Sequence, residues 1–331
     1  MLKRSAVSTA AALALLFASG AARADSAVVV TSKPIHALVS GVMAGIGAPE
    51  LLVDGQTSPH AYAMKPSDAR KVHRAKVFFR TSESFEPYTA KLVASLPKSV
   101  DVVTLEETPG LKLLDRREGG AFEAGHDHGA SHSHGHGKSQ SQSASRAGGH
   151  HHDHGHEEHI HDPHFWLDPD NAKAMVRHIA DVLSERMPDK AATIRSNAEA
   201  EISRLDALAS DLARELAPFA GKPFMVYHDA YQYLEKRYGL TAVGTVTASP
   251  ELPPSGKRLS DLRQKISSAG AVCVFAEPYL DPRAIAVVVE GTGTRTATLD
   301  PEGTSLEAGP DLYYKLLRNL ATNLTACLTR P

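Results

Sequence analysis

Histidine is the residue type whose distribution in this 331-residue chain most clearly points to chemistry. Twelve of the 18 histidines fall between His126 and His161, and the other six are spread over the rest of the chain. A neutral imidazole is a ligand for Zn²⁺, Cu²⁺ and Ni²⁺, whereas Mn²⁺ prefers more oxygen ligands. The sequence therefore predicts an interaction with a transition metal, most simply zinc.

Three isolated histidines lie where an α/β protein would place a ligand. His60 follows a predicted strand in the loop GQTSPH, His164 precedes a predicted helix in DPHFWLDP, and His228 joins a strand to a helix in YHDAY. Ligands of open α/β sheets gather beyond the carboxyl ends of the strands, where such junctions lie. We therefore predict His60, His164 and His228 as metal ligands. The other isolated histidines are expected to be surface or packing residues: His36, His73 and His178.

Two carboxylates at predicted strand ends complete this candidate site. Asp300 follows the strand 296–299, and Glu277 ends the neighbouring strand 272–276. Three imidazoles with one carboxylate or one water form an ordinary tetrahedral zinc set. A further carboxylate can orient a ligating imidazole through the second ring nitrogen. The fourth ligand is thus Asp300 or water, and Glu277 is expected to support a histidine.

The histidine-rich segment from 119 to 162 differs in composition from its surroundings. It is made of His, Gly, Ser, Asp and Gln with almost no apolar residue, so we expect it to be disordered. Two interpretations stay open: a collector or buffer of zinc near the cleft mouth, or a tolerated surface loop that binds metal weakly. Its candidates for accessory low-affinity metal binding are His126, His128, His132, His134, His136, His150, His151, His152, His154, His156, His159 and His161.

The N-terminus has the pattern of an export signal. A basic start at Lys3 and Arg4 is followed by the apolar stretch 6–18 and by Ala-Arg-Ala at 22–24, which predicts a signal peptide over 1–24. The apolar stretch is shorter than the ~20 residues that a membrane-spanning helix needs. Cleavage also removes Arg23 and lowers the formal charge from −2 to −5. This acidic balance argues against nucleic acid or an anionic membrane as a partner.

Apolar strand patterns alternate with helix patterns along two stretches of the chain. The expected strands are 27–31, 51–53, 76–79 and 100–105, and then 224–227, 241–246, 272–276 and 296–299. The expected helices are 34–45, 67–74, 85–95, one starting at Asp168-Pro169, 190–216, 229–237, 256–269, 282–289 and 311–328. This alternation indicates two α/β lobes with parallel sheets, joined by helix. Cys273 and Cys327 are most simply one disulfide in an oxidising compartment, with a buried thiol at Cys273 as the alternative.

Four motifs together resemble a known family of metal receptors. HAYAMKPSD (60–68), DPHFWLDP (162–169), YHDAYQY (227–233) and FAEPY (275–279) look like the solute-binding proteins of bacterial zinc ABC importers, the cluster A-I or family 9 receptors. The likeness runs from about residue 26 to the C-terminus, with the motifs in family order. It implies two lobes, each with a four-stranded parallel sheet flanked by helices, joined by a long rigid linker helix, with metal in the cleft.

The resemblance also assigns ranges and residues. The expected division is a signal peptide at 1–24, an N-terminal lobe at 25–167 that contains the insert 119–162, a linker helix at 168–187 and a C-terminal lobe at 188–331. His60, His164 and His228 match the family's three histidine ligands, and Asp300 matches a carboxylate ligand of manganese-binding relatives. Those relatives have Glu at the position of His228. Cys273 and Cys327 resemble a disulfide of some zinc members, whereas Pro59 replaces an acidic residue found before the first ligand in others.

The function implied is a monomeric, high-affinity periplasmic receptor that captures Zn²⁺ between its lobes and delivers it to an inner-membrane ABC permease. Zinc is then the transported ligand, and the protein is neither an enzyme nor a membrane-spanning protein. One alternative is a manganese or iron receptor of the same architecture, or an adhesin-like metal-binding lipoprotein. The lipoprotein is disfavoured because no cysteine follows the signal segment. A second alternative is a mononuclear zinc hydrolase, which is disfavoured because the chain has no HExxH motif.

Overall fold

The computed structural model describes residues 27–55, 58–117, 121–122, 160–247, 254–278 and 280–329. The predicted signal peptide and the histidines from His126 to His159 lie outside these ranges. Within them, no helix combines the length and the apolar character that a crossing of the membrane requires.

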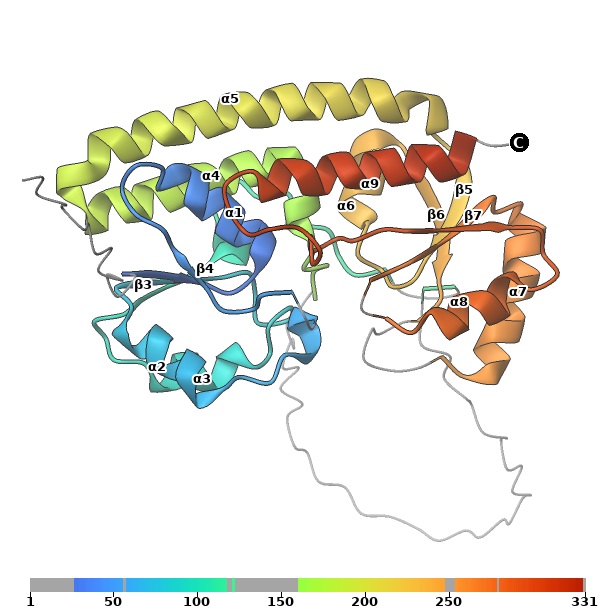
Figure 1. The fold of residues 1–331 in the computed structure, drawn as a ribbon, viewed down its shortest axis with the longest axis horizontal. Coiled ribbons are helices and arrows are strands. Elements are labelled where there is room, and N and C mark those ends of the chain that lie inside the picture. Colours follow the sequence, from blue (N-terminus) through green and yellow to red (C-terminus); the bar gives the residue numbers. More distant parts are fainter. Residues whose placement is uncertain are drawn as a thin grey trace, which may run out of the picture.

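The first lobe is a four-stranded parallel sheet with helices on both faces (Figure 1). Its strand order is β2-β1-β3-β4. The elements are β1 (Val28–Val30), α1 (Lys33–Val42), β2 (Glu50–Leu51), α2 (Pro66–Arg74), β3 (Val77–Arg80), α3 (Thr89–Ser95) and β4 (Asp101–Thr104). Alternate strand residues face opposite sides, so Val28 and Val30 pack towards α1 whereas Val29 and Phe78 pack towards α2 and α3. Burial on both faces explains the unbroken apolar run of β1.

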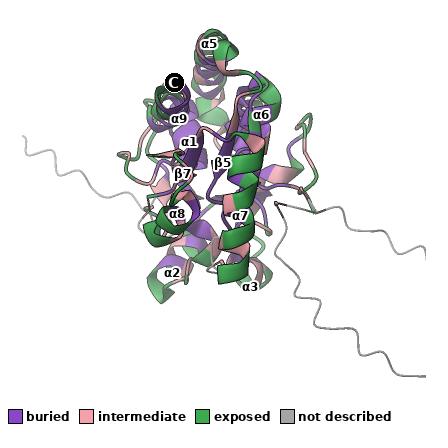
Figure 2. Cartoon of the chain, turned by 90° about the vertical axis from the view of Figure 1, so that its right-hand side faces the viewer, coloured by how far each residue is buried: buried purple, intermediate pink, exposed green. Residues whose placement is uncertain are grey.

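The second lobe repeats this arrangement with the strand order β6-β5-β7-β8. Its elements are β5 (Pro223–Val226), α6 (Gln232–Tyr238), β6 (Thr241–Thr245), α7 (Gly256–Ala269), β7 (Cys273–Ala276), α8 (Pro282–Val289), β8 (Arg295–Thr298) and α9 (Leu312–Thr329). Figure 2 shows α7 with a largely exposed outer face and the strands β5 and β7 buried behind it. Two parallel sheets of four strands confirm the predicted fold class.

Helices α4 (Pro169–Arg186) and α5 (Ala191–Leu216) connect the two lobes along one side of the molecule (Figure 1). Asp168 caps α4 by accepting the backbone N–H of Asp170, and Pro169 occupies the first turn, as the sequence predicted. The 26 residues of α5 extend about 39 Å and run beside α4, α1 and α9. We propose that the chain divides into an N-terminal lobe at 25–167, a linker helix at 168–187 and a C-terminal lobe at 188–331.

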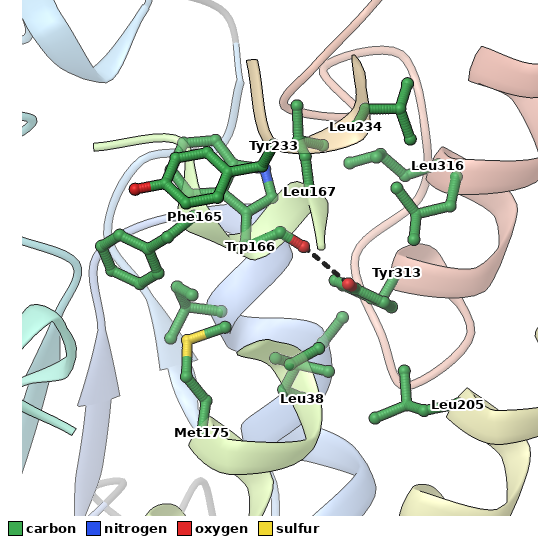
Figure 3. Close-up of a cluster of buried hydrophobic side chains, with 14 of the residues drawn as sticks. Leu38, Phe165, Trp166, Leu167, Met175, Leu205, Tyr233, Leu234, Tyr313 and Leu316 are labelled. Carbon is green, nitrogen blue, oxygen red and sulfur yellow. Dashed lines mark hydrogen bonds between the residues drawn. The ribbon is translucent and has the colours of Figure 1, made fainter. Parts of the chain in front are cut away.

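One apolar core extends from the first lobe through the connecting helices into the second. Figure 3 shows its centre, where Trp166 and Leu38 lie among side chains of α4, α5, α6 and α9. The Tyr313 hydroxyl of α9 donates to the backbone oxygen of Trp166 at 2.6 Å. Because close-packed interiors resist deformation, this shared core makes the joint between the lobes stiff.

Two predicted helices begin later in the structure than the sequence suggested. The helix expected from 85 begins at Thr89, because Phe85 and Glu86 lie in a turn held by the Ser82 side chain and backbone. The helix expected from 229 begins at Gln232, since the residues after β5 form a bend. Both shortened helices leave irregular chain at the carboxyl ends of strands.

A disulfide joins Cys273 at the start of β7 to Cys327 near the end of α9. Both cysteines are buried. This confirms the predicted pairing and excludes the alternative of a free thiol at Cys273.

Candidate metal centre

Three separate elements bring His60, His164 and His228 to one point between the lobes. His60 lies in the 3-10 helix η1 (Pro59–Ala61), whose first turn is capped by the Ser58 hydroxyl accepting the His60 N–H at 3.3 Å. His164 immediately precedes the 3-10 helix η3 (Phe165–Leu167), which leads into α4. His228 follows β5 of the second lobe. The site is therefore assembled from both lobes and from the segment that connects them.

The distances between the three rings suit a small tetrahedral cation. The Nε2 atom of His164 lies 3.4 Å from that of His60 and 3.3 Å from that of His228. One ligand atom from each of the three histidines lies within 4.8 Å of the others. A tetrahedral Zn²⁺ with Zn–N bonds of roughly 2.0–2.1 Å holds its nitrogens about 3.3–3.4 Å apart. Among the described residues, no other group of three or more His, Cys, Asp or Glu side chains meets in this way.

Two buried carboxylates fix the orientation of two of the rings. The Nδ1 atom of His164 lies 2.8 Å from Oδ1 of Asp162, and the Nδ1 atom of His228 lies 2.7 Å from Oε1 of Glu277. A carboxylate accepts, so each Nδ1 carries the proton and each Nε2 presents a lone pair. Lone pairs 3.3 Å apart on buried rings repel each other, and a cation between them removes that repulsion. Carboxylates support the ligating histidines of protein zinc sites in the same way, through the ring nitrogen that does not face the metal.

The surroundings keep most of the cluster uncharged before metal arrives. Burial, reinforced by the neighbouring rings, lowers the pKa of His60 and that of His164 well below the usual value. Burial also acts on His228, but the charge and the hydrogen bond of Glu277 outweigh it and raise the pKa of His228. Burial raises the pKa of Asp162 to about 6. The proton that competes most strongly with a metal is therefore the one on His228.

Aromatic side chains form the wall of the site on the side of the first lobe. The ring of Phe85 meets that of His60 edge-on at 4.6 Å between centroids, and Trp166 lies 5.2 Å from His164. His164 and His228 are each only 3% exposed, whereas His60 is half-buried. An apolar wall lowers the local dielectric and strengthens metal–ligand electrostatics. His60 is thus the most exposed of the three rings.

Asp300 lies outside the group of three histidines. One of its carboxylate oxygens accepts the Glu302 N–H at 3.2 Å, and the other accepts the Thr304 hydroxyl at 2.8 Å and the Ser305 N–H at 3.4 Å. In this conformation the carboxylate stabilises its own loop. Both alternatives for the fourth ligand, Asp300 and water, are therefore kept. Glu277 contacts an imidazole as expected, and that imidazole belongs to His228.

Two residues of the site were not identified from the sequence. Asp162 precedes His164 by two positions, and this Asp-x-His spacing, typical of a turn in which an Asp side chain caps nearby N–H groups, was the available signal. Phe85 gave no signal, because its position beneath His60 depends on the turn that replaces the start of the expected helix.

The remaining described histidines lie apart from the cluster. His161, at the end of the insert, pairs with Asp115 at 3.2 Å in an antiparallel bridge. His36 is buried, with Nε2 3.1 Å from the backbone oxygen of Pro49, and His73 and His178 lie on helices α2 and α4. His36 thus packs in the interior and His73 is exposed, and within the described residues none of these last three joins the three-histidine group.

The sequence and the fold of the chain are similar to those of known zinc-uptake proteins. The family model described as zinc-uptake complex component A, periplasmic, matches residues 28–327. A high-affinity zinc uptake system protein ZnuA of Brucella suis biovar 1 (strain 1330) is 48% identical over 307 residues, which cover 92% of each chain. The ZnuA protein of Paracoccus denitrificans (strain Pd 1222) is 41% identical over 332 residues, covering 99% of each chain. The crystal structure of the Zn(II)-bound ZnuA-like domain of Streptococcus pneumoniae AdcA superposes with a TM-score of 0.64 and 25% identity, covering 89% of this chain and 97% of that one.

Proposed function

This chain belongs to the family of periplasmic zinc-uptake component A proteins, and on that basis we propose that it is a high-affinity receptor for Zn²⁺. In this proposal the ion is cargo, held between the lobes by His60, His164 and His228 and completed by Asp300 or water. The observation that carries the proposal is the convergence of three Nε2 atoms. That of His164 lies 3.4 Å from that of His60 and 3.3 Å from that of His228.

The donor set favours zinc over manganese or iron. Three imidazoles suit Zn²⁺, whereas Mn²⁺ prefers more oxygen ligands. His228 supplies nitrogen at the position where the manganese-binding relatives carry Glu, and its Nδ1 proton is held by Glu277. A receptor for manganese or iron with the same architecture remains the second candidate, and a metal-competition titration separates the two.

We further propose that the protein carries the metal without doing chemistry on a substrate. In the HExxH class of zinc hydrolases, a carboxylate acts as the base for the attacking water. Asp162 and Glu277, the carboxylates beside the cluster, instead accept the Nδ1–H groups of His164 and His228. Their role in this arrangement is to orient ligands.

Export, a periplasmic location and delivery to an inner-membrane ABC permease complete the proposal. The family description names a periplasmic component of an uptake complex. The signal pattern at 1–24 agrees with that location. We propose that the protein acts as a monomer that releases zinc to the permease.

Single substitutions of His60, His164 and His228 by Ala test the site. Zinc affinity is measured by competition with a chromophoric chelator, and thermal unfolding of the metal-free variants checks that each is folded. We expect a loss of at least about a hundredfold for each variant, with His178→Ala as a control that leaves the affinity unchanged. High affinity retained in all three variants would show that the cleft assignment is wrong.

The histidine-rich insert is proposed as a set of accessory low-affinity sites. The composition of the insert predicts a segment that must become ordered to bind, and the cost of ordering should make its sites weaker than the cleft. Deletion of Gly125–Glu158 is expected to remove only the weaker phases of a zinc titration. Loss of the tightest phase instead would contradict the two-tier proposal.

A further inference from the structure

Lys33, the first residue of α1 in the first lobe, donates its side-chain hydrogen bonds to the second lobe. Its Nζ atom donates to the backbone oxygens of Thr304 at 2.7 Å, Leu306 at 2.8 Å and Gly303 at 3.4 Å. Three carbonyl oxygens match the three N–H donors of an ammonium group. The residue is only 8% exposed, and its hydrogen bonds to Thr304 and Leu306 are partly buried at the junction between the lobes.

The segment that Lys33 holds, residues 300–306, is also fixed beside the metal-binding histidines. The indole N–H of Trp166 donates to the backbone oxygen of Pro301 at 3.0 Å, and the Trp166 ring lies 5.2 Å from that of His164. A small cavity at the same junction is lined by Lys33, Val53, Gly55, Pro59 and Glu302. Pro59 directly precedes His60, and Trp166 lies beside His164. The segment 300–306 therefore lies next to residues that adjoin two of the three histidines.

Gly55 permits the close approach of the lobes at this point. Its φ of +88° lies in the left-handed region that favours glycine. A Cβ atom there would lie 3.1 Å from Thr304 Cα and 3.1 Å from Lys33 Nζ. The backbone that leads to η1 and His60 is therefore pressed against the segment that Lys33 holds.

We propose that Lys33 is a latch between the lobes that slows the release of the bound metal. The latch is formed in the conformation in which the three Nε2 atoms are close enough to share one cation. Withdrawal of His60 from the metal requires the backbone near Gly55 to separate from Thr304, and the Lys33 contacts oppose that separation. Lys33 is thus a positioning residue that acts through the segment 300–306 and does not touch the ion. This inference rests on the proposed role of the cleft as the zinc site.

The test compares Lys33→Met with the parent chain, using Zn²⁺ and a chelator in stopped-flow measurements. Methionine keeps the length of the side chain and removes its three donors. We expect the zinc dissociation rate to rise at least about tenfold, while the association rate changes less than about twofold, because the latch closes after the metal has entered. Lys71→Met, which removes a surface ion pair of 2.7 Å with Glu50 within the first lobe, is the matched control and should change neither rate.

Each outcome decides the proposal. An unchanged dissociation rate in a folded Lys33→Met variant overturns the latch, whereas a parent chain that fails to bind zinc overturns the proposed function itself. If Lys33→Met does not fold, Gly55→Ala provides the decision, because its added Cβ would meet both Lys33 Nζ and Thr304 Cα at 3.1 Å and disturb the contact between them. That variant is also expected to release zinc faster, and a parent-like rate there would equally count against the latch.

Discussion

Glu277 and His228 lie 2.7 Å apart, with Oε1 of the glutamate accepting from Nδ1 of the imidazole across the carboxyl ends of two neighbouring strands. Both residues are only 3% exposed. Asp162 makes the equivalent contact to His164 at 2.8 Å. Each of these two rings therefore has its tautomer and its direction set by a buried carboxylate before the metal arrives.

The variant Glu277→Gln tests how much this support contributes to zinc affinity. The amide oxygen can still accept the Nδ1–H of His228, but without a full negative charge it leaves the ring less basic. Loss of such an outer partner typically costs 10–100-fold in metal affinity, and we expect a loss near the lower end. A chelator-competition titration measures it, with the exposed Glu290→Gln as control. An affinity within twofold of the parent would show that the negative charge of Glu277 does not contribute to zinc binding.

The dependence of zinc affinity on pH should report the proton on His228. Because the pKa values of His60 and His164 lie well below 6.5, those rings stay neutral where His228, whose pKa is raised, takes up a proton. Zinc must displace that one proton, so the affinity should fall about tenfold per pH unit as the pH drops below the raised pKa of His228. Titrations between pH 7 and 8 keep Asp162, whose pKa is about 6, largely ionised. A fall approaching a thousandfold per unit would indicate three competing protons instead.

The sequence was sufficient for the elements and for the approximate place of the site. The buried run at 27–31 predicted β1, and the rule that ligands gather at strand ends selected His60 and His228. Those inferences depend on local patterns, which a single sequence contains.

Two contacts near the site could not be predicted from local sequence patterns. Lys33 and Thr304 are separated by 271 positions, and no periodicity relates them. Phe85 reaches His60 only because a turn replaces the first residues of the expected helix. The relative placement of the lobes, set by the shared core, decides the first contact, whereas the turn at Ser82 within the first lobe decides the second.

The buried carboxyl group of Glu86 is expected to make the stability of the metal-free protein depend on pH. Its carboxylate accepts the N–H of Thr81 at 2.8 Å and the Thr81 hydroxyl at 3.1 Å, and burial raises its pKa to about 7. The folded state then binds more protons than the unfolded state between pH 4.5 and 7, so the free energy of unfolding decreases as the pH rises through that window. Glu86→Gln should be more stable than the parent at pH 8, by at most about 3 kcal/mol, and equally stable below pH 4.5. Urea unfolding at the two pH values measures this, and a constant difference would contradict it.

The disulfide should stabilise the second lobe without contributing to the metal site. Cys273 and Cys327 close a loop with a sequence separation of 54, for which the chain-entropy model gives about 4 kcal/mol as an upper figure. Cys273 begins β7, at the opposite end of that strand from Glu277. The double variant Cys273→Ala/Cys327→Ala should therefore unfold at lower urea concentration and keep the zinc affinity of the parent. A weakened zinc site in the folded double variant would show that the disulfide positions the ligands.

The variant Asp300→Asn decides between a carboxylate and water as the fourth ligand. In the structure both carboxylate oxygens accept hydrogen bonds from residues 302–305, so Asp300 would have to abandon these contacts to reach the metal. Asparagine can preserve one acceptor while removing the charge, and we expect zinc affinity to fall less than about tenfold, far less than for the histidine variants. Thr304→Val, which removes only the hydroxyl that donates to Asp300, controls for disturbance of the loop. A loss as large as that of His60→Ala, with Thr304→Val unaffected, would instead establish Asp300 as a direct ligand. If Asp300 only shaped its loop, removing the Thr304 hydroxyl that helps to hold that loop would lower the zinc affinity as well.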